Sequence, residues 1–286
     1  MPLFFFVSGI TFEKFSKYNN VKELKKLIWR RVINLVVPTL IFIVGLLLVF
    51  GTKKNVIFYY DNVWFLIHLT FIFLIIGIAE FLKLKEVKIE RVLVAIDIIF
   101  LVFFGSVQIV LRYLNYDVLS KYAQEVGKFF LYLLCFILGR FLIKNKIKFS
   151  KVIILIAFVI FMIFQIIAVL FELDDKLVFL KMLCGISGSF FFIGVYSQYR
   201  KKCVKIEKYL AMYSLEIYLI HSDIIHGVLR EFDIKLSLLG ACIVFVLDII
   251  IPLGIAYLEK YLLPLDFIFH PCKYLKLTLN DNNERE

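Results

Sequence analysis

The apolar segment at residues 213–223 combines hydroxyl groups with a histidine. Spacings of four and three residues place Ser214, Tyr218 and His221 on one face of a helix. His221 lies about twelve residues, or ~18 Å, from the basic end of this segment, near the midplane of a bilayer core ~30 Å thick. A neutral imidazole there can accept or deliver a proton, and the hydroxyls can orient a hydroxyl-bearing ligand. The alternative interpretation is a polar clamp between two membrane helices.

A second candidate is the cationic cluster at residues 25–31, which includes Lys26, Arg30 and Arg31 and leads into an apolar segment containing Pro38. Guanidinium groups bind phosphate in a bidentate fashion, so a phosphate-rich ligand would suit this cluster. Basic residues also flank membrane helices simply to set their topology, which is the alternative interpretation.

A third candidate is the run at residues 62–68, at the opposite end of a span, where Trp64 and His68 stand one helical turn apart. An interfacial aromatic belt accounts for it on physical grounds alone. The functional interpretation is an aromatic wall for sugar rings, with His68 as a hydrogen-bonding partner. The cysteines show no C-x-x-C spacing, so we expect neither a metal site nor a disulfide framework.

Other ionisable residues fall within or beside apolar segments. Asp97 and Asp248 lie inside spans, where we expect them to pair with basic residues across helices or to stay protonated. Glu80 and Lys181 lie near segment ends, and we expect their side chains to reach toward the membrane surface. The Ser8-Gly9 pair is typical of close helix packing.

The elements that must position these residues are membrane helices. The chain has 286 residues, of which 62% are hydrophobic and 32 are Phe, with a mean hydropathy of +0.90. A soluble domain cannot bury that much apolar surface. We therefore predict an all-α, polytopic helical bundle in one domain, residues 1–258, followed by a tail, residues 259–286. Eight apolar segments are long enough to span: 31–50, 63–82, 92–111, 126–143, 152–171, 177–199, 209–228 and 236–258.

The basic residues alternate between the two sides of this predicted bundle. Placing the loop at residues 13–31 in the cytoplasm puts 25 of the 34 Lys and Arg residues inside and 9 outside. This orientation predicts a cytoplasmic carboxyl terminus. The net charge of +11 is spread over these loops rather than gathered in one patch, so we expect no nucleic-acid partner.

The amino-terminal apolar run, residues 1–12, is too short to cross a bilayer. Twelve helical residues cover ~18 Å, and a helix ending inside lipid leaves unsatisfied backbone groups unless protein covers them. The sequence therefore predicts a partial helix in addition to the eight full spans, and we expect the recorded start to fall within a helix.

Four sequence elements together resemble the membrane acyltransferase 3 family. The run at residues 1–9 resembles its P-L-F-F-x-x-S-G element, typical of the fucose 4-O-acetylase-like branch. Arg30 and Arg31 ahead of Pro38 resemble the family's basic loop and the span that follows it. Residues 64–66 are similar to its W-F-L element, and residues 214–221 to its late S-L-x-I-Y-L-x-H element.

The resemblance implies a membrane-bound O-acyltransferase of a bacterial inner membrane. Such an enzyme moves an acyl group, usually acetyl, from cytoplasmic acyl-CoA to a hydroxyl of a cell-surface or lipid-linked glycan. No cofactor is bound, because acetyl-CoA is a substrate. The resemblance assigns the CoA phosphates to Lys26, Arg30 and Arg31. It assigns catalysis to Tyr218 and His221, and the acceptor path to Trp64, His68 and Ser214.

Two departures from the family pattern shape the alternatives. The family carries a further upstream helix with a basic residue and a histidine base, and Asn34 breaks its R-x-x-R pattern here. From the first departure we expect the 286 residues alone to be inactive. Three hypotheses follow: an acyltransferase with a longer native chain, an inactive truncated remnant, or a transporter of glycans or lipid-linked sugars. The last lacks the inverted repeat typical of transporters.

Overall fold

The computed structural model describes residues 2–15, 18–50, 56–84, 90–147, 149–170 and 178–199, with seven isolated positions between 247 and 261. Every regular element in these ranges is an α-helix, which confirms the predicted all-α class. The seven helices are α1 (Pro2–Phe15), α2 (Val21–Phe50), α3 (Val56–Leu84), α4 (Glu90–Tyr113), α5 (Asp117–Lys144), α6 (Lys151–Leu170) and α7 (Val178–Tyr199).

Four of these helices contain stretches long and apolar enough to cross a membrane, as a multi-pass membrane protein requires. They are Val21–Gly45, Trp64–Lys83, Val92–Tyr113 and Asp117–Lys144. Two shorter apolar stretches, Lys151–Ile167 and Met182–Gln198, lie in α6 and α7. The first six predicted spans correspond to α2 through α7. The last two, 209–228 and 236–258, fall almost entirely outside the described residues, so the total of eight stays a prediction.

Two stretches that we expected to be loops are largely helical. α2 begins at Val21, well inside the predicted loop 13–31, and α5 begins at Asp117, well ahead of the predicted span 126–143. Asn20 explains the early start of α2, because its Oδ1 accepts a hydrogen bond from the Glu23 amide at 2.9 Å. The Glu23 carboxylate accepts in return from the Asn19 amide at 2.7 Å, which resembles a capping box. The cationic cluster at residues 25–31 is therefore part of a helix.

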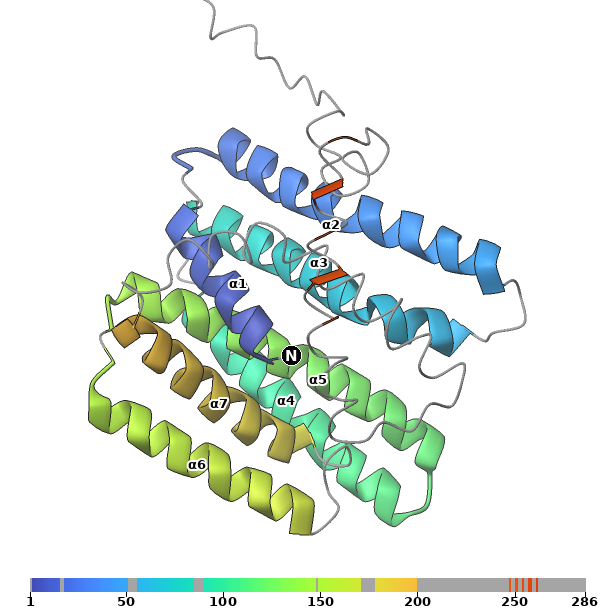
Figure 1. Cartoon of the computed structure of the whole chain (residues 1–286), viewed down its shortest axis with the longest axis vertical. Coiled ribbons are helices and arrows are strands. Elements are labelled where there is room, and N and C mark those ends of the chain that lie inside the picture. Colours follow the sequence, from blue (N-terminus) through green and yellow to red (C-terminus); the bar gives the residue numbers. More distant parts are fainter. Residues whose placement is uncertain are drawn as a thin grey trace, which may run out of the picture. The chain divides into compact units, whose positions relative to one another are not determined.

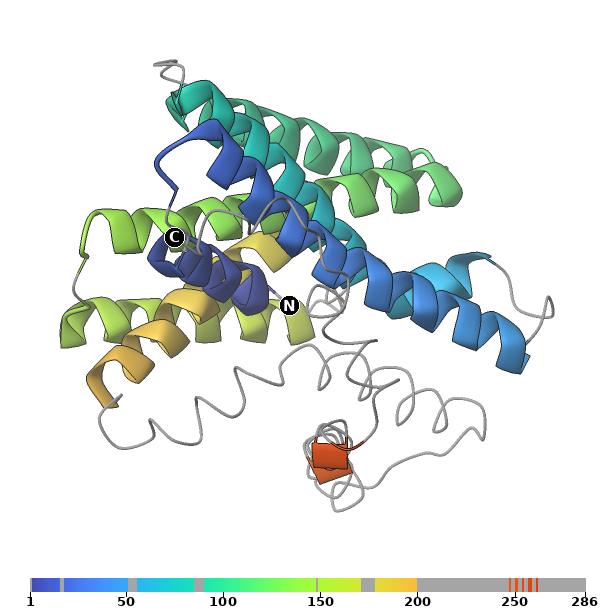
Figure 2. The same cartoon turned by 90° about the horizontal axis from the view of Figure 1, so that it is seen from above.

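α4 and α5 form an antiparallel hairpin, visible side by side in Figures 1 and 2. The turn uses Asn115 in the left-handed region, at φ 59°, a conformation that asparagine tolerates well. The Tyr116 amide donates to the Leu111 carbonyl at 2.8 Å, which closes α4 with a Schellman-type bond. Phe130 of α5 stacks on Phe100 and Phe104 of α4, with ring centroids 5.1 and 5.9 Å apart.

The helices fall into two compact units. The first contains residues 1–24 and 75–202, and so holds α1, the end of α3 and all of α4 through α7. The second contains residues 25–74 and 203–286, and so holds most of α2 and the first part of α3. In the first unit α1 packs against α5 and α7, α4 packs against α5, and α6 packs against α7.

α1 is apolar and short, and protein covers one face of it. Phe5, Phe6 and Phe12 are fully buried. Phe5 stacks on Tyr132 of α5 with centroids 4.4 Å apart, and Phe6 meets Phe190 of α7 edge to face at 5.5 Å. A helix too short to cross the bilayer must be covered by protein rather than lipid, and α5 and α7 provide this contact.

The crossing of α1 and α5 depends on two glycines. A Cβ atom on Gly9 would overlap the backbone carbonyl of Phe136, and one on Gly139 would overlap the backbone carbonyl of Phe6. The two backbones are therefore in direct contact at this crossing, as small residues allow in membrane bundles. The close packing that we expected at Ser8-Gly9 is confirmed.

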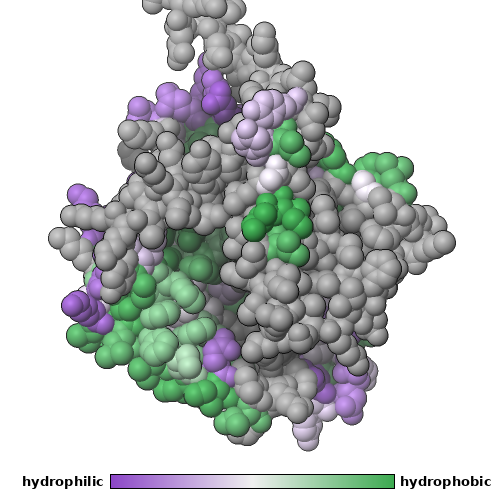
Figure 3. Space-filling view, viewed as in Figure 1, coloured by the Kyte–Doolittle hydropathy of each residue, from purple (hydrophilic) through white to green (hydrophobic). Residues whose placement is uncertain are grey.

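The surface over α6 and α7 is apolar. Figure 3 shows hydrophobic side chains, in green, gathered at the lower left, where these helices lie in Figure 1. Val152, Leu155 and Ile156 of α6 are each more than half exposed. An apolar surface of this kind is suited to lipid contact rather than to water.

We predict that Gly9→Leu separates α1 from α5 and lowers the apparent melting temperature of the detergent-purified protein. The Phe136 carbonyl cannot move away from an added side chain without shifting α5. The matched control is Gly45→Ala in α2, where nothing lies within 4 Å of the added Cβ and alanine is the better helix former by ~1 kcal/mol. A Gly9→Leu protein as stable as wild type would contradict this account of the crossing.

Candidate functional site

The guanidinium of Arg140 lies between two carboxylates at one end of the first unit. Its Nε and Nη2 donate to Glu13 Oε2 at 3.0 and 2.9 Å, and Nη2 also donates to Glu80 Oε1 at 2.5 Å. Arg140 also lies over the Phe12 ring, with Cζ 5.1 Å from the centroid. The ends of α1, α3 and α5 therefore meet at one cation.

Glu80 is the most enclosed member of this cluster, with its side chain only 2% exposed. Its Oε2 accepts from the Tyr18 hydroxyl at 2.5 Å and from Lys83 Nζ at 3.2 Å. Burial, together with the hydrogen bond to this carboxylate, raises the pKa of Tyr18 above its ordinary value of 10.0, so the phenol remains a donor at physiological pH. Our expectation that Glu80 reaches toward the membrane surface is wrong, because three groups from three segments hold it in place.

A cavity of about 510 Å³ opens beside this ion cluster. Its apolar wall comes from α3, α4 and α5, and its charged and amide side chains all stand at the end where Arg140 lies. The lining residues are Glu13, Ile76, Ala79, Glu80, Leu93, Val94, Leu134, Ile137, Leu138, Arg140, Phe141, Lys144 and Asn145.

Asp97 lies one helical turn beyond Leu93 and Val94, on the face of α4 that packs against α5. It is 1% exposed, and neither carboxylate oxygen has a hydrogen-bond partner among the described residues. The buried thiol of Cys135 on α5 is within electrostatic reach. The basic partner that we expected for Asp97 is thus not found in the described part of the chain. A buried carboxyl without a partner destabilises the fold that holds it.

In the second unit, α2 carries the predicted phosphate-binding residues. Lys26 and Arg30 are four positions apart and share a helix face; Lys26 is half-buried and Arg30 is exposed. Arg31 is half-buried, and its Cζ lies 5.7 Å from the centroid of the Phe73 ring on α3. The structure therefore separates Arg31, which packs on an aromatic ring, from Arg30, which lies at the surface.

Trp64 and His68 of α3 contact each other. Their rings meet edge to face with centroids 5.5 Å apart, and His68 is 6% exposed. His68 Nδ1 lies 2.7 Å from the Trp64 carbonyl oxygen. A carbonyl can only accept, so Nδ1 carries the hydrogen, and the neutral ring has its lone pair on Nε2. This geometry gives His68 a defined tautomer with a proton-accepting nitrogen.

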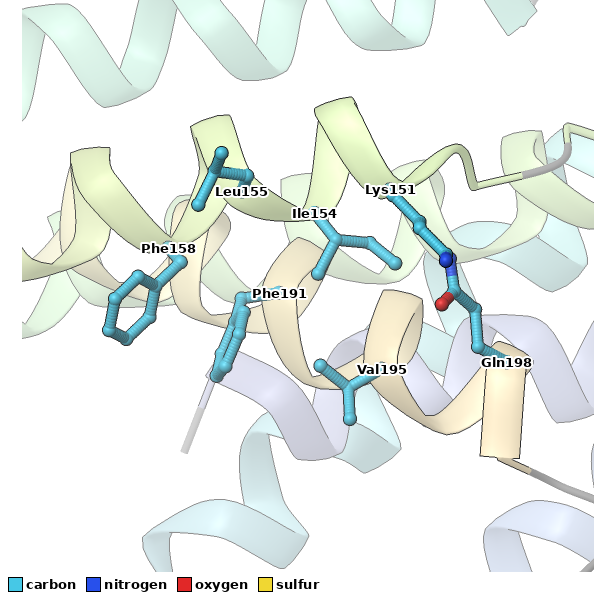
Figure 4. Close-up of a pocket in the computed structure, with 7 residues that line it drawn as sticks. All are labelled: Lys151, Ile154, Leu155, Phe158, Phe191, Val195 and Gln198. Carbon is cyan, nitrogen blue, oxygen red and sulfur yellow. The ribbon is translucent and has the colours of Figure 1, made fainter.

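The predicted catalytic residues His221 and Tyr218, together with Ser214, lie outside the described residues, as does Asp248. Their roles stay predictions. The structure also adds a groove of about 330 Å³ between α6 and α7, lined by seven residues shown in Figure 4. Lys151 and Gln198 lie together at one end of this groove, while Phe158 and Phe191 lie toward the other.

Comparison with known proteins gives one match. A family profile described as an acyltransferase domain matches residues 1–257 of this chain. No curated protein and no solved structure matches. The matched region takes in all of the first unit and most of the second, including the cationic helix face, the Trp64–His68 pair and the segment that contains His221.

We predict that Arg140→Leu lowers the free energy of unfolding by about 3–5 kcal/mol, because it leaves two carboxylates in the protein interior without their cation. Thermal unfolding in detergent would measure the loss. Adding Glu80→Gln to Arg140→Leu should restore part of it. The matched control is Lys128→Leu on the same helix, which breaks a more exposed ion pair with Glu125 and should change stability by about 1 kcal/mol or less. Equal losses for both substitutions would contradict the central position of Arg140.

We predict that Asp97→Leu raises the apparent melting temperature, because it replaces a buried carboxyl that has no partner by an apolar side chain of similar size. Asp97→Asn is the isosteric comparison and should raise it less, since the amide is still polar. A fall in melting temperature on Asp97→Leu would show that residues outside the described ranges pair with this carboxyl.

Proposed function

The chain belongs to the acyltransferase 3 family, and on that premise we propose that it is a membrane-bound O-acyltransferase. The group transferred is acetyl, the donor is cytoplasmic acetyl-CoA, and the acceptor is a hydroxyl of a cell-surface or lipid-linked glycan. The family match over residues 1–257 is the observation that carries this proposal. The enzyme would lie in a bacterial inner membrane, with its carboxyl terminus in the cytoplasm.

The cationic face of α2 supports the donor side of the proposal. Acetyl-CoA carries several phosphate groups, and Lys26 and Arg30 present two cations on one face of α2, just ahead of the predicted span 31–50. Arg30 is exposed and can form the bidentate bonds that guanidinium groups make with phosphate. Arg31 adds positive charge while its stacking on Phe73 fixes the helix that presents the other two.

The acceptor side is supported by the aromatic pair in α3. An indole ring offers an apolar face suited to sugar rings, and His68 adds a nitrogen that can accept a hydrogen bond from a hydroxyl. Trp64 and Lys83 bracket an apolar stretch of 20 residues, typical of a span with an aromatic residue at one interface and a cation at the other. The donor and acceptor groups would then approach the bilayer from opposite sides.

The transfer itself is a single acyl exchange. The acceptor hydroxyl oxygen attacks the thioester carbonyl carbon, the carbon–sulfur bond breaks, and the CoA thiolate leaves. His221 takes the hydroxyl proton as a general base and returns it to the thiolate, while Tyr218 and Ser214 orient the acceptor. The products are an O-acetylated glycan and CoA, with no change of oxidation state and no need for a cofactor.

We predict that membranes of the native cell, which contain the protein in the form that the cell makes, transfer radiolabelled acetyl from acetyl-CoA to glycan. His221→Ala should lower the rate at least ~10²-fold, because it removes the general base. The matched control is Arg112→Gln, an exposed cation at the end of α4, which should leave the rate unchanged. Glycan transport without acetyl transfer would refute the proposed enzyme in favour of a transporter. Wild-type rates in a normally inserted His221→Ala protein would reduce His221 to a packing residue.

A further inference from the structure

We propose that the groove between α6 and α7 binds one anionic phospholipid of the membrane, with the phosphate at Lys151 and an acyl chain along the apolar wall. The inference rests on the lining, the position and the charge of this groove in the first unit. It does not depend on acyl transfer, because none of the residues placed in that reaction lines the groove.

The wall of the groove is apolar and open to one side. It is made by Ile154, Leu155 and Phe158 of α6 and by Phe191 and Val195 of α7, as Figure 4 shows. The rings of Phe158 and Phe191 contact each other with centroids 5.0 Å apart and mark its apolar end. Leu155 is 62% exposed, so the groove is continuous with the apolar surface that is suited to lipid contact. A lipid chain can therefore enter the groove sideways from the bilayer.

The position of the polar end matches the depth of a lipid headgroup. Lys151 is the first residue of α6, and the apolar stretch of this helix starts there. Seven residues separate Lys151 from Phe158, which is ~10 Å along a helix. Half of the hydrocarbon core of a bilayer is ~15 Å thick. A lipid with its phosphate at Lys151 would thus contact the wall along about two thirds of its leaflet.

The charge of the groove identifies the headgroup. Among the described residues that line the groove, Lys151 is the one charged side chain, and Gln198 adds an amide beside it. Neither α6 nor α7 contains an acidic residue, and Lys151 forms no ion pair with any residue in the described ranges. The polar end therefore carries one uncompensated positive charge. A phosphodiester with one negative charge is complementary to it and can accept a charge-assisted hydrogen bond from the lysine.

The sequence beside the polar end carries the same sign of charge. Residues 140–151, which lead into α6, and residues 200–208, which follow α7, contain five Lys or Arg residues each. Together these two stretches contain one acidic residue, Glu207. Both lie on the predicted cytoplasmic side, where the leaflet is rich in anionic lipids and basic pockets between membrane helices bind their headgroups. An anionic lipid is therefore favoured over a zwitterionic one.

Native mass spectrometry of the full chain, released from mild detergent with equal amounts of dioleoyl phosphatidylglycerol and dioleoyl phosphatidylcholine, tests the proposal. We expect one phosphatidylglycerol retained per chain in preference to phosphatidylcholine, whose headgroup has no net charge. Lys151→Glu should lower the affinity for phosphatidylglycerol by about tenfold or more, as expected for loss of a charged contact, and Lys151→Arg should preserve it. Val195→Trp fills the groove and should lower the retention of both lipids. Lys151 is exposed, so its variants should fold.

Two matched controls keep the test specific. Lys121→Glu makes the same charge change at an exposed lysine of α5, and Ile156→Trp adds bulk on α6 outside the groove. Both should retain phosphatidylglycerol as wild type does, and inorganic phosphate should not displace it. Equal retention of the two lipids, or unchanged retention in Lys151→Glu, would overturn the proposal.

Two other occupants of the groove would also overturn it. Displacement of the lipid by acetyl-CoA would assign the groove to the donor. A lipid-free dimer that dissociates in the Val195→Trp variant would assign it to a second copy of the chain.

Discussion

The first unit depends on one buried cation. Arg140 sits with its side chain 11% exposed and is balanced by Glu13 of α1 and Glu80 of α3. A charge in that position is tolerable only while both carboxylates are within hydrogen-bonding distance, since an uncompensated charge in the interior is far less stable than a paired one. The ion cluster therefore fixes the ends of three helices that are distant in sequence, and it gives the neighbouring cavity a rigid polar end.

The ion cluster and the glycine crossing of α1 and α5 support each other. Gly139 directly precedes Arg140, and Gly9 lies one helical turn before Glu13 on α1. The backbone contact that these glycines allow brings Glu13 to its partner, and the ion pair in turn holds α1 at a register where its phenylalanines pack on α5 and α7. A short apolar helix without such a lateral anchor would have little to fix its depth in lipid.

The sequence predicted the helical class and the close packing at Gly9, because each follows from local composition or spacing. It did not predict the role of Glu80. That residue lies near the end of an apolar run, where a carboxylate ordinarily reaches water, and its main partner stands 60 positions further along the chain. From the sequence, Arg140 was only one of the 25 Lys and Arg residues assigned to the cytoplasmic side. The predicted catalytic group around His221 rests on sequence alone, since those residues lie outside the described ranges.

The pairing of α1 with α5 also has a consequence for biosynthesis. Glu13 and Arg140 are 127 positions apart, and chains grow at roughly 5–20 residues per second. α1 therefore leaves the ribosome on the order of 6–25 s before its partner helix exists. During that interval its glycine face has no α5 to pack against, and Glu13 has no arginine. α1 can therefore pack against α5 only after both helices have been made, so α1 reaches its final place long after its own synthesis.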